Sequence, residues 1–241
     1  MTTQNEPVIM TTQGYVASAG VKILCYAAPH KGKTDAIRML PRPLVLASEH
    51  GLTTLAKYDI PYVNVTSVAE VKMMVKWIKD KKYVGKFDSL VLDSVSYLGS
   101  CLLSEFRNNT AKYTGNGQKH YGLLKENIID LLQALFEANV HVYVTAWQDD
   151  QYDSFGNKVG IYPFVDGQSI KSFLVHYFDL TVHLDWHNIA TTDAEGKQTT
   201  VQAPYYQTVE ANGVFARSRK KGLEPFEPAD LGKLIEKLST L

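Results

Sequence analysis

One segment of eight residues constrains the fold of this chain more than any other: Ala27-Ala28-Pro29-His30-Lys31-Gly32-Lys33-Thr34. It has the spacing of a phosphate-binding loop (P-loop), G-x-x-x-x-G-K-[ST], with alanine at the first glycine position. The apolar run from Val21 to Tyr26 predicts a buried strand before it. Lys33 to Met39 predicts a short helix after it, ended by Pro41. Strand, loop and helix in this order are the context that the motif requires.

The residue types in this segment suit a nucleoside triphosphate. In a P-loop, successive backbone N–H groups and the positive end of the helix hold the phosphates. Lys33 is then expected to reach the β- and γ-phosphates, and the Thr34 hydroxyl to coordinate Mg²⁺. A lysine in an ordinary turn is the alternative. The nucleotide-binding residues predicted here are Ala28, Pro29, His30, Lys31, Gly32, Lys33, Thr34 and Asp35.

Length and charge set modest bounds. The 241 residues suffice for one sizeable α/β domain, and 25 basic residues balance 25 acidic ones. Because the net charge is zero, any site for a polyanion has to be local. Cys25 and Cys101 lie in apolar runs without metal-binding spacing, which is typical of reduced core thiols. No membrane span or signal peptide is visible, and we expect a cytoplasmic protein.

Strands and helices are predicted to alternate along the chain. Further strands are expected over 43–48, 62–65, 87–93, 140–147 and 178–184. Helices are expected over 67–82, 98–108, 121–139 and 169–177, with polar loops over 109–120 and 148–168. Asn212-Gly213 predicts the turn of a late β-hairpin over 205–219, and Glu227 to Asp230 opens a last helix with Pro228 near its first turn. This order predicts a mostly parallel central sheet covered by helices on both faces.

The segment Ser89-Leu90-Val91-Leu92-Asp93-Ser94 has the Walker B pattern, in which a buried strand ends in an acid. Ligands of α/β sheets bind at the carboxyl ends of the strands, so Asp93 is expected to lie there and to hold Mg²⁺. A helix-capping aspartate at the end of a buried strand is the alternative. The preceding P-loop favours the Walker B interpretation.

Hydrolysis also needs a group that orients or deprotonates water. Glu49 directly follows the strand 43–48 and is expected at the same edge of the sheet, which makes it the candidate base. An acid that caps the next short helix is the alternative. Thr145 and Gln148, near the end of the strand 140–147, are both candidates for sensing the γ-phosphate.

Several of these segments resemble bacterial RecA. Ala47 to Leu52 is similar to the strand-end acid segment of RecA, Val91 to Leu98 to its Walker B strand, and Tyr143 to Gln148 to the strand that ends in its phosphate-sensing glutamine. The short length, Leu40 to Leu46 and the late Ala216 to Arg219 resemble more closely the phage-encoded AAA-domain ATPases. That family includes the Sak-type, RecA-like single-strand annealing proteins.

The resemblance covers residues 20–238 and implies a RecA-like P-loop NTPase core that uses ATP and Mg²⁺. It implies that Glu49 is the general base, that Asp93 binds Mg²⁺ and that Gln148 links the γ-phosphate to a DNA-binding loop. Trp147 departs from the family, because RecA has a small amide at this place.

The densest basic cluster is Ala216 to Lys221. RecA-like enzymes place cations that act on a neighbouring subunit in a comparable late segment. Arg217 or Arg219 is therefore expected to reach the γ-phosphate of a neighbour as an arginine finger. A solvent-exposed hairpin end is the alternative.

Two polar segments suit single-stranded DNA, because they combine cations with aromatic residues on which bases stack. In the first, the candidates are Arg107, Lys112, Tyr113, Lys119 and Tyr121. The second, 148–168, contains Tyr152, Phe155, Lys158 and Tyr162. Ordinary surface loops are the alternative. Since the net charge is zero, affinity for DNA would have to come from many subunits along one strand, in a ring or filament.

The sequence as a whole predicts a homo-oligomeric, DNA-stimulated ATPase that acts on single-stranded DNA in phage recombination or annealing, in the cytoplasm of an infected bacterium. One RecA-like ATPase domain is expected over residues 20–241, after a flexible N-terminal extension of residues 1–19. The alternative function is a nucleotide-switched module that contacts a protein partner with little turnover. A small-molecule kinase fits less well, because no arginine-rich lid segment is visible.

Overall fold

The computed structural model describes residues 19–80, 85–109, 111–192 and 198–240. Within them, ten strands form one sheet, whose main path runs β10-β8-β7-β1-β5-β4-β2-β3. The strands are β1 (Lys22–Ala27), β2 (Pro43–Ala47), β3 (Tyr62–Asn64), β4 (Ser89–Asp93), β5 (His141–Tyr152), β6 (Lys158–Phe164), β7 (Leu180–Thr192), β8 (Gln198–Gln207), β9 (Arg217–Ser218) and β10 (Phe226–Pro228). All but residue 19 of the predicted N-terminal extension lies outside the described residues, so the domain boundary stays a prediction.

The centre of the sheet is parallel. Strand β1 pairs in parallel with β5 and β7, and β4 pairs in parallel with β5 and β2. Every residue of β1 and β4 is buried, as expected for apolar strands that are covered on both faces. Antiparallel pairs occur toward one side, where β7 pairs with β8 and β8 with β10. The predicted mostly parallel α/β sheet is confirmed.

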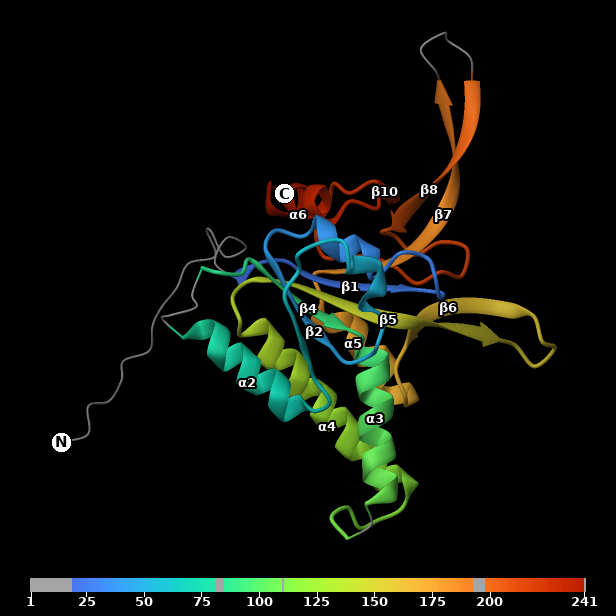
Figure 1. The fold of residues 1–241 in the computed structure, drawn as a ribbon. Coiled ribbons are helices and arrows are strands. Elements are labelled where there is room, and N and C mark those ends of the chain that lie inside the picture. The colour runs from blue at the N-terminus through green and yellow to red at the C-terminus, as the bar shows by residue number, and fades with distance from the viewer. Residues whose placement is uncertain (1–18, 81–84, 110, 193–197, 241) are drawn as a thin grey trace.

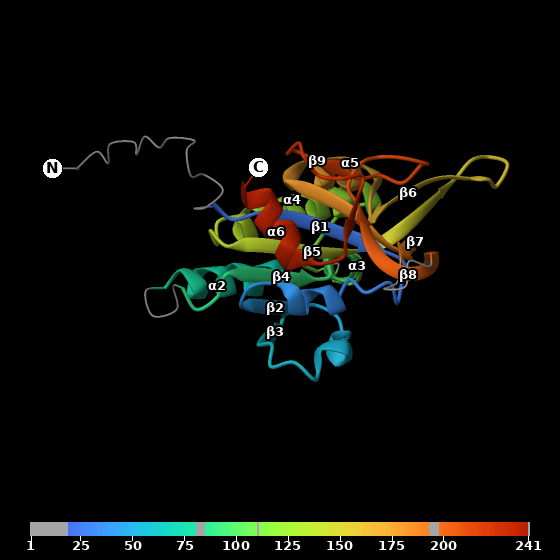
Figure 2. The same cartoon turned by 90° about the horizontal axis from the view of Figure 1, so that it is seen from above.

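Helices cover both faces of the sheet. They are the 3₁₀ helices η1 (Asp35–Met39) and η2 (Leu52–Leu55) and the α-helices α2 (Val68–Lys79), α3 (Val95–Asn108), α4 (Gly117–Phe136), α5 (Gln168–Tyr177) and α6 (Leu231–Thr240). Helices α2 to α5 bury their apolar sides in one core cluster, and η1, η2 and α6 contribute to the second. Figure 1 shows α2, α3 and α4 below the sheet with α6 above it, and Figure 2 looks down on α6.

Three segments project from this core (Figure 1). The β7–β8 hairpin rises as a long arm, the β5–β6 hairpin extends to one side, and the α3–α4 connection points away from the sheet. The β5–β6 hairpin corrects the expectation of a long loop over 148–168. The polar sequence of this hairpin did not indicate strands. A hairpin that projects from the sheet has solvent on both faces, so it needs no apolar side.

The end of the chain also differs from expectation. The late hairpin consists of β7 and β8, whereas 205–219 holds only the end of β8, a turn at Asn212-Gly213 and β9. That turn has positive φ at both residues, 53° and 74°, as an Asn-Gly turn requires, but it closes only one isolated bridge. Pro228 ends β10, and α6 begins later, where the Asp230 carboxylate accepts the N–H of Lys233 at 3.1 Å. In the described part of the chain, no helix is both long and apolar enough to cross a membrane.

Candidate functional site

The carboxyl ends of β1, β5, β4 and β2 meet at one edge of the sheet, because these strands are parallel neighbours. A cleft of about 900 Å³ opens at this edge. Residues 29–35 of the P-loop line it together with Glu49, Asp93 and Gln148. Clefts of this size are typical of small-molecule and cofactor sites. The structure therefore brings together residues that lie far apart in the sequence.

The side chain of the P-loop lysine contacts the backbone at the start of the same loop. The Lys33 ammonium donates hydrogen bonds to the carbonyl oxygens of Ala27 at 2.7 Å and Ala28 at 3.1 Å. Burial lowers the pKa of Lys33, and the negative charges of Asp93 and Glu49 oppose this shift. The second glycine of the motif is required by the backbone, because Gly32 has φ of 104°, a conformation that side chains rarely adopt. Ala28 is the one predicted nucleotide-binding residue that does not line the cleft.

The two predicted Mg²⁺ ligands are in direct contact. The Thr34 hydroxyl donates to one carboxylate oxygen of Asp93 at 2.9 Å, and the buried Thr145 hydroxyl donates to the other. Asp93 is only 2% exposed, so its position is fixed by these bonds. A hydroxyl and a carboxylate at the end of a cleft are oxygen donors of the kind that Mg²⁺ prefers. The residues present thus fit the nucleotide and Mg²⁺ that a P-loop implies.

Glu49 lies beside Asp93 at the end of β2. The Ser48 hydroxyl donates to the carbonyl of Ser94 at 2.8 Å and accepts the Ser94 N–H at 2.9 Å, which fastens the end of β2 to the end of β4. Burial and then the charge of Asp93 raise the pKa of Glu49, while hydrogen bonds from Ser94 and Trp147 act against them. A half-buried carboxyl with a raised pKa is suited to accept a proton from water. Its role as a base stays a prediction.

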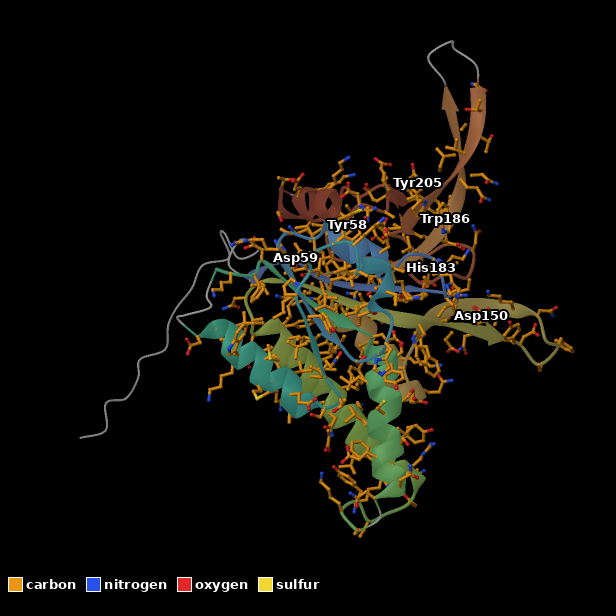
Figure 3. All side chains as sticks on the ribbon, in the orientation of Figure 1. Tyr58, Asp59, Asp150, His183, Trp186 and Tyr205 are labelled. Atoms are coloured by element: carbon orange, nitrogen blue, oxygen red, sulfur yellow. The ribbon has the colours of Figure 1, made fainter. Side chains whose placement is uncertain are left out.

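Gln148 is held by Asp150 and His183, neither of which was among the predicted site residues. Its amide nitrogen donates to Asp150 at 2.6 Å, so its amide oxygen faces His183 at 2.9 Å. Burial lowers the pKa of His183 to about 4, so the ring is neutral and its Nε2–H donates to Gln148. Asp150 pairs with Lys158 at 2.9 Å in the β5–β6 hairpin. Figure 3 labels Asp150 near the base of this hairpin and His183 on β7.

Of the two candidates for sensing the γ-phosphate, only Gln148 lines the cleft. Thr145 is completely buried and positions Asp93 instead. A sequence signal for His183 did exist. The expected strand 178–184 runs parallel to β1, with His183 opposite Tyr26, so the residues at its end reach the same sheet edge as the P-loop.

Arg217 and Arg219 lie away from the cleft of their own chain. Arg217 is opposite Thr181 in β9, near the start of β7, and its guanidinium contacts the ring of His176 at 2.7 Å. Arg219 donates to the carbonyl of His176 and lies 3.9 Å from the Asp179 carboxylate. Within one chain these arginines do not complete the site. Their predicted action on a neighbouring subunit stays a prediction.

The five predicted DNA-binding residues gather at one end of the α3–α4 pair. Arg107 donates to the Tyr121 hydroxyl at 2.9 Å and lies over its ring, at 5.5 Å from the centroid. The Lys112 ammonium lies 4.8 Å from the centroid of the Tyr113 ring. Lys119 is exposed in the first turn of α4. Cations and aromatic rings are therefore adjacent here, and contact with DNA stays a prediction.

Comparison with known proteins shows a sequence family and a likeness to solved structures. Residues 19–220 match the sequence family described as an AAA domain. No curated protein matches. A KaiC-like protein from the hyperthermophilic archaeon Pyrococcus horikoshii OT3 is similar with a TM-score of 0.42 and 13% identity, over 78% of this chain and 86% of that one. Because the family match spans most of the chain and includes the P-loop, the protein belongs to the AAA-domain family of P-loop ATPases.

Proposed function

We propose that this protein is a RecA-like ATPase that acts on single-stranded DNA in phage recombination or annealing. The observation that carries the ATPase part is the convergence of Lys33, Thr34, Glu49, Asp93 and Gln148 on one cleft. Four of these residues end a strand or follow one, and Gln148 lies in β5 just beyond its pairing with β1. Together they would supply a phosphate-binding cation, two metal ligands, a base and a polar sensor.

Each residue has a defined task in the proposed reaction. Lys33 and the backbone N–H groups of the P-loop bind the β- and γ-phosphates. Thr34 and Asp93 would hold Mg²⁺, which supplies positive charge to the phosphate oxygens. Glu49 accepts a proton from the attacking water, and its partial burial, which raises its pKa, makes it a stronger base.

Gln148 connects the cleft to the β5–β6 hairpin through its hydrogen bond to Asp150. Its amide donates to Asp150, so a γ-phosphate that takes the same N–H releases Asp150 from that bond. Asp150 in turn pairs with Lys158 on the returning strand. Nucleotide would thereby change the anchoring of a projecting hairpin whose Phe155 is 89% exposed. An exposed aromatic ring is suited to stack on a base of single-stranded DNA.

Oligomerisation is part of the proposal. Arg217 and Arg219 lie too far along the sheet to serve their own cleft, and they are accessible to a neighbour. A ring or filament would also multiply the modest DNA affinity of a chain with zero net charge.

The experiment that tests the proposal is ATP turnover with and without single-stranded oligonucleotide. Turnover that depends on Mg²⁺ and rises with DNA supports it. Lys33→Ala should abolish turnover in a folded protein, whereas Lys76→Ala, on the exposed face of α2, should not. ATP binding with little turnover, unchanged by DNA, would instead indicate the nucleotide-switched binding module.

A further inference from the structure

Trp186 is a large aromatic residue on the wall of the cleft. It lies on β7 just beyond the level of the P-loop, and 48% of it is exposed. Its neighbour Asp185 forms an ion pair with Lys31 of the P-loop at 2.5 Å. The same carboxylate accepts the backbone N–H of Trp186 at 2.7 Å. Figure 3 labels Trp186 at the base of the β7–β8 arm. An ion pair thus fixes the backbone that carries this indole against the P-loop.

The strand order sets the direction in which a nucleotide lies. Glu49 follows β2, Asp93 ends β4, and Gln148 lies in β5 just beyond its pairing with β1. Strands β2, β4 and β5 all lie on one side of β1. Strand β7 lies on the other side of β1. A γ-phosphate has to face the hydrolytic groups, so the nucleoside at the opposite end of the triphosphate extends toward β7. That is the flank on which Trp186 is exposed.

The other tryptophan of the cleft has a different environment. Trp147 stacks on Phe164 with 5.9 Å between ring centroids, and it lies on the γ-phosphate side, where it acts against the raised pKa of Glu49. For the Trp186 side chain, no ring contact or hydrogen bond with another described residue is found. An exposed aromatic face beside a phosphate site is suited to stack on a base.

We propose that the Trp186 indole is the stacking platform for the nucleobase of the bound nucleoside triphosphate. This inference rests on the proposed function, because it assumes that the P-loop binds the phosphates. Stacking is indifferent to hydrogen-bonding pattern but increases with ring area, so the site should prefer purine over pyrimidine nucleotides. Lys31 and Asp185 act as positioning residues that hold the platform in place.

The test is isothermal titration of wild type, Trp186→Phe, Trp186→Leu and Trp186→Ala with three Mg²⁺-containing probes: ATP, CTP and inorganic tripolyphosphate. Tripolyphosphate has no base and reports the P-loop alone. Loss of one base-stacking ring should weaken ATP about tenfold in the Leu and Ala variants, while Phe keeps most of the affinity. Tripolyphosphate affinity should stay within about twofold in all of them, and the preference for ATP over CTP should shrink. Tyr62→Ala, another exposed aromatic residue that does not line the cleft, is the matched control.

The outcomes separate this inference from the proposed function. Wild-type protein that binds neither ATP nor tripolyphosphate would overturn both. If the wild type binds ATP and Trp186→Leu binds it with the same affinity, the stacking role alone is overturned. Equal weakening of ATP and tripolyphosphate would also overturn it, because it would mean that Trp186 only supports the P-loop. The Leu variant keeps apolar bulk at the base of the arm, so the test does not depend on the Ala variant folding.

Discussion

The Thr34 hydroxyl donates a hydrogen bond to the Asp93 carboxylate across 2.9 Å, joining two residues that are 59 positions apart in the chain. Asp93 is almost fully buried, so removing this donor leaves a carboxylate oxygen without a partner. The contact ties the P-loop to the end of β4 even before any metal is considered.

The first prediction concerns this contact. Thr34→Val removes the hydroxyl at nearly constant volume and should lower Mg²⁺-dependent ATP turnover by about a hundredfold or more. Thr34→Ser keeps the hydroxyl and should retain most of the activity. Turnover measured against Mg²⁺ concentration checks this. Equal activity of Val and Ser variants would contradict a role for Thr34 in metal binding.

The second prediction concerns Glu49, whose pKa is raised by burial. Glu49→Gln should retain ATP binding but hydrolyse ATP more slowly by about two to four powers of ten, because it lacks a basic lone pair. A folded-state pKa above the unfolded value means that the carboxyl favours folding below the unfolded pKa and loses this contribution as pH rises through the folded pKa. Glu49→Gln should therefore melt slightly higher than wild type at pH 7.5, with the difference vanishing near pH 4. A lower melting temperature with normal turnover would indicate a structural acid.

The third prediction concerns His183, whose pKa burial lowers to about 4. A lowered folded-state pKa means that the neutral ring contributes stability above the unfolded pKa, near 6.5, and that this is lost as pH falls toward 4. His183→Gln keeps an N–H for Gln148 but does not titrate, so its stability should fall less between pH 6.5 and 4. Urea unfolding at several pH values in this range gives the slope of the unfolding free energy against pH for the wild type and for His183→Gln. Parallel slopes would show that His183 does not stay neutral in the fold.

The fourth prediction concerns assembly. The Arg217→Ala, Arg219→Ala double variant should bind ATP but hydrolyse it slowly, and mixing it with Glu49→Gln should recover activity. Mixed interfaces can pair an intact base on one subunit with intact arginines on another. Specific activity should also rise with protein concentration, and DNA should lower the concentration required. If activity is strictly linear in enzyme concentration and does not recover on mixing, the two arginines do not act on a neighbouring subunit.

The P-loop, Asp93 and Glu49 could be predicted because each follows or ends a buried apolar strand, and parallel strands bring their carboxyl ends to one edge. The β5–β6 and β7–β8 hairpins were missed or misplaced for the opposite reason. Their projecting parts have no buried face, so pairing leaves no periodic signal. The strand that contains His183 was predicted, but His183 was not singled out, because which strand lies beside β1 is a long-range property that local sequence does not record.

Strand β5 is continuous from the parallel core to the tip of its hairpin, and Gln148 and Asp150 lie where it leaves the sheet. This continuity has a thermodynamic consequence. If a partner at the hairpin tip favours one arrangement of Gln148, then it alters nucleotide affinity by some factor, and nucleotide must alter affinity for that partner by the same factor. This coupling factor could then be measured from either side, as the effect of the partner on nucleotide affinity or of nucleotide on partner affinity.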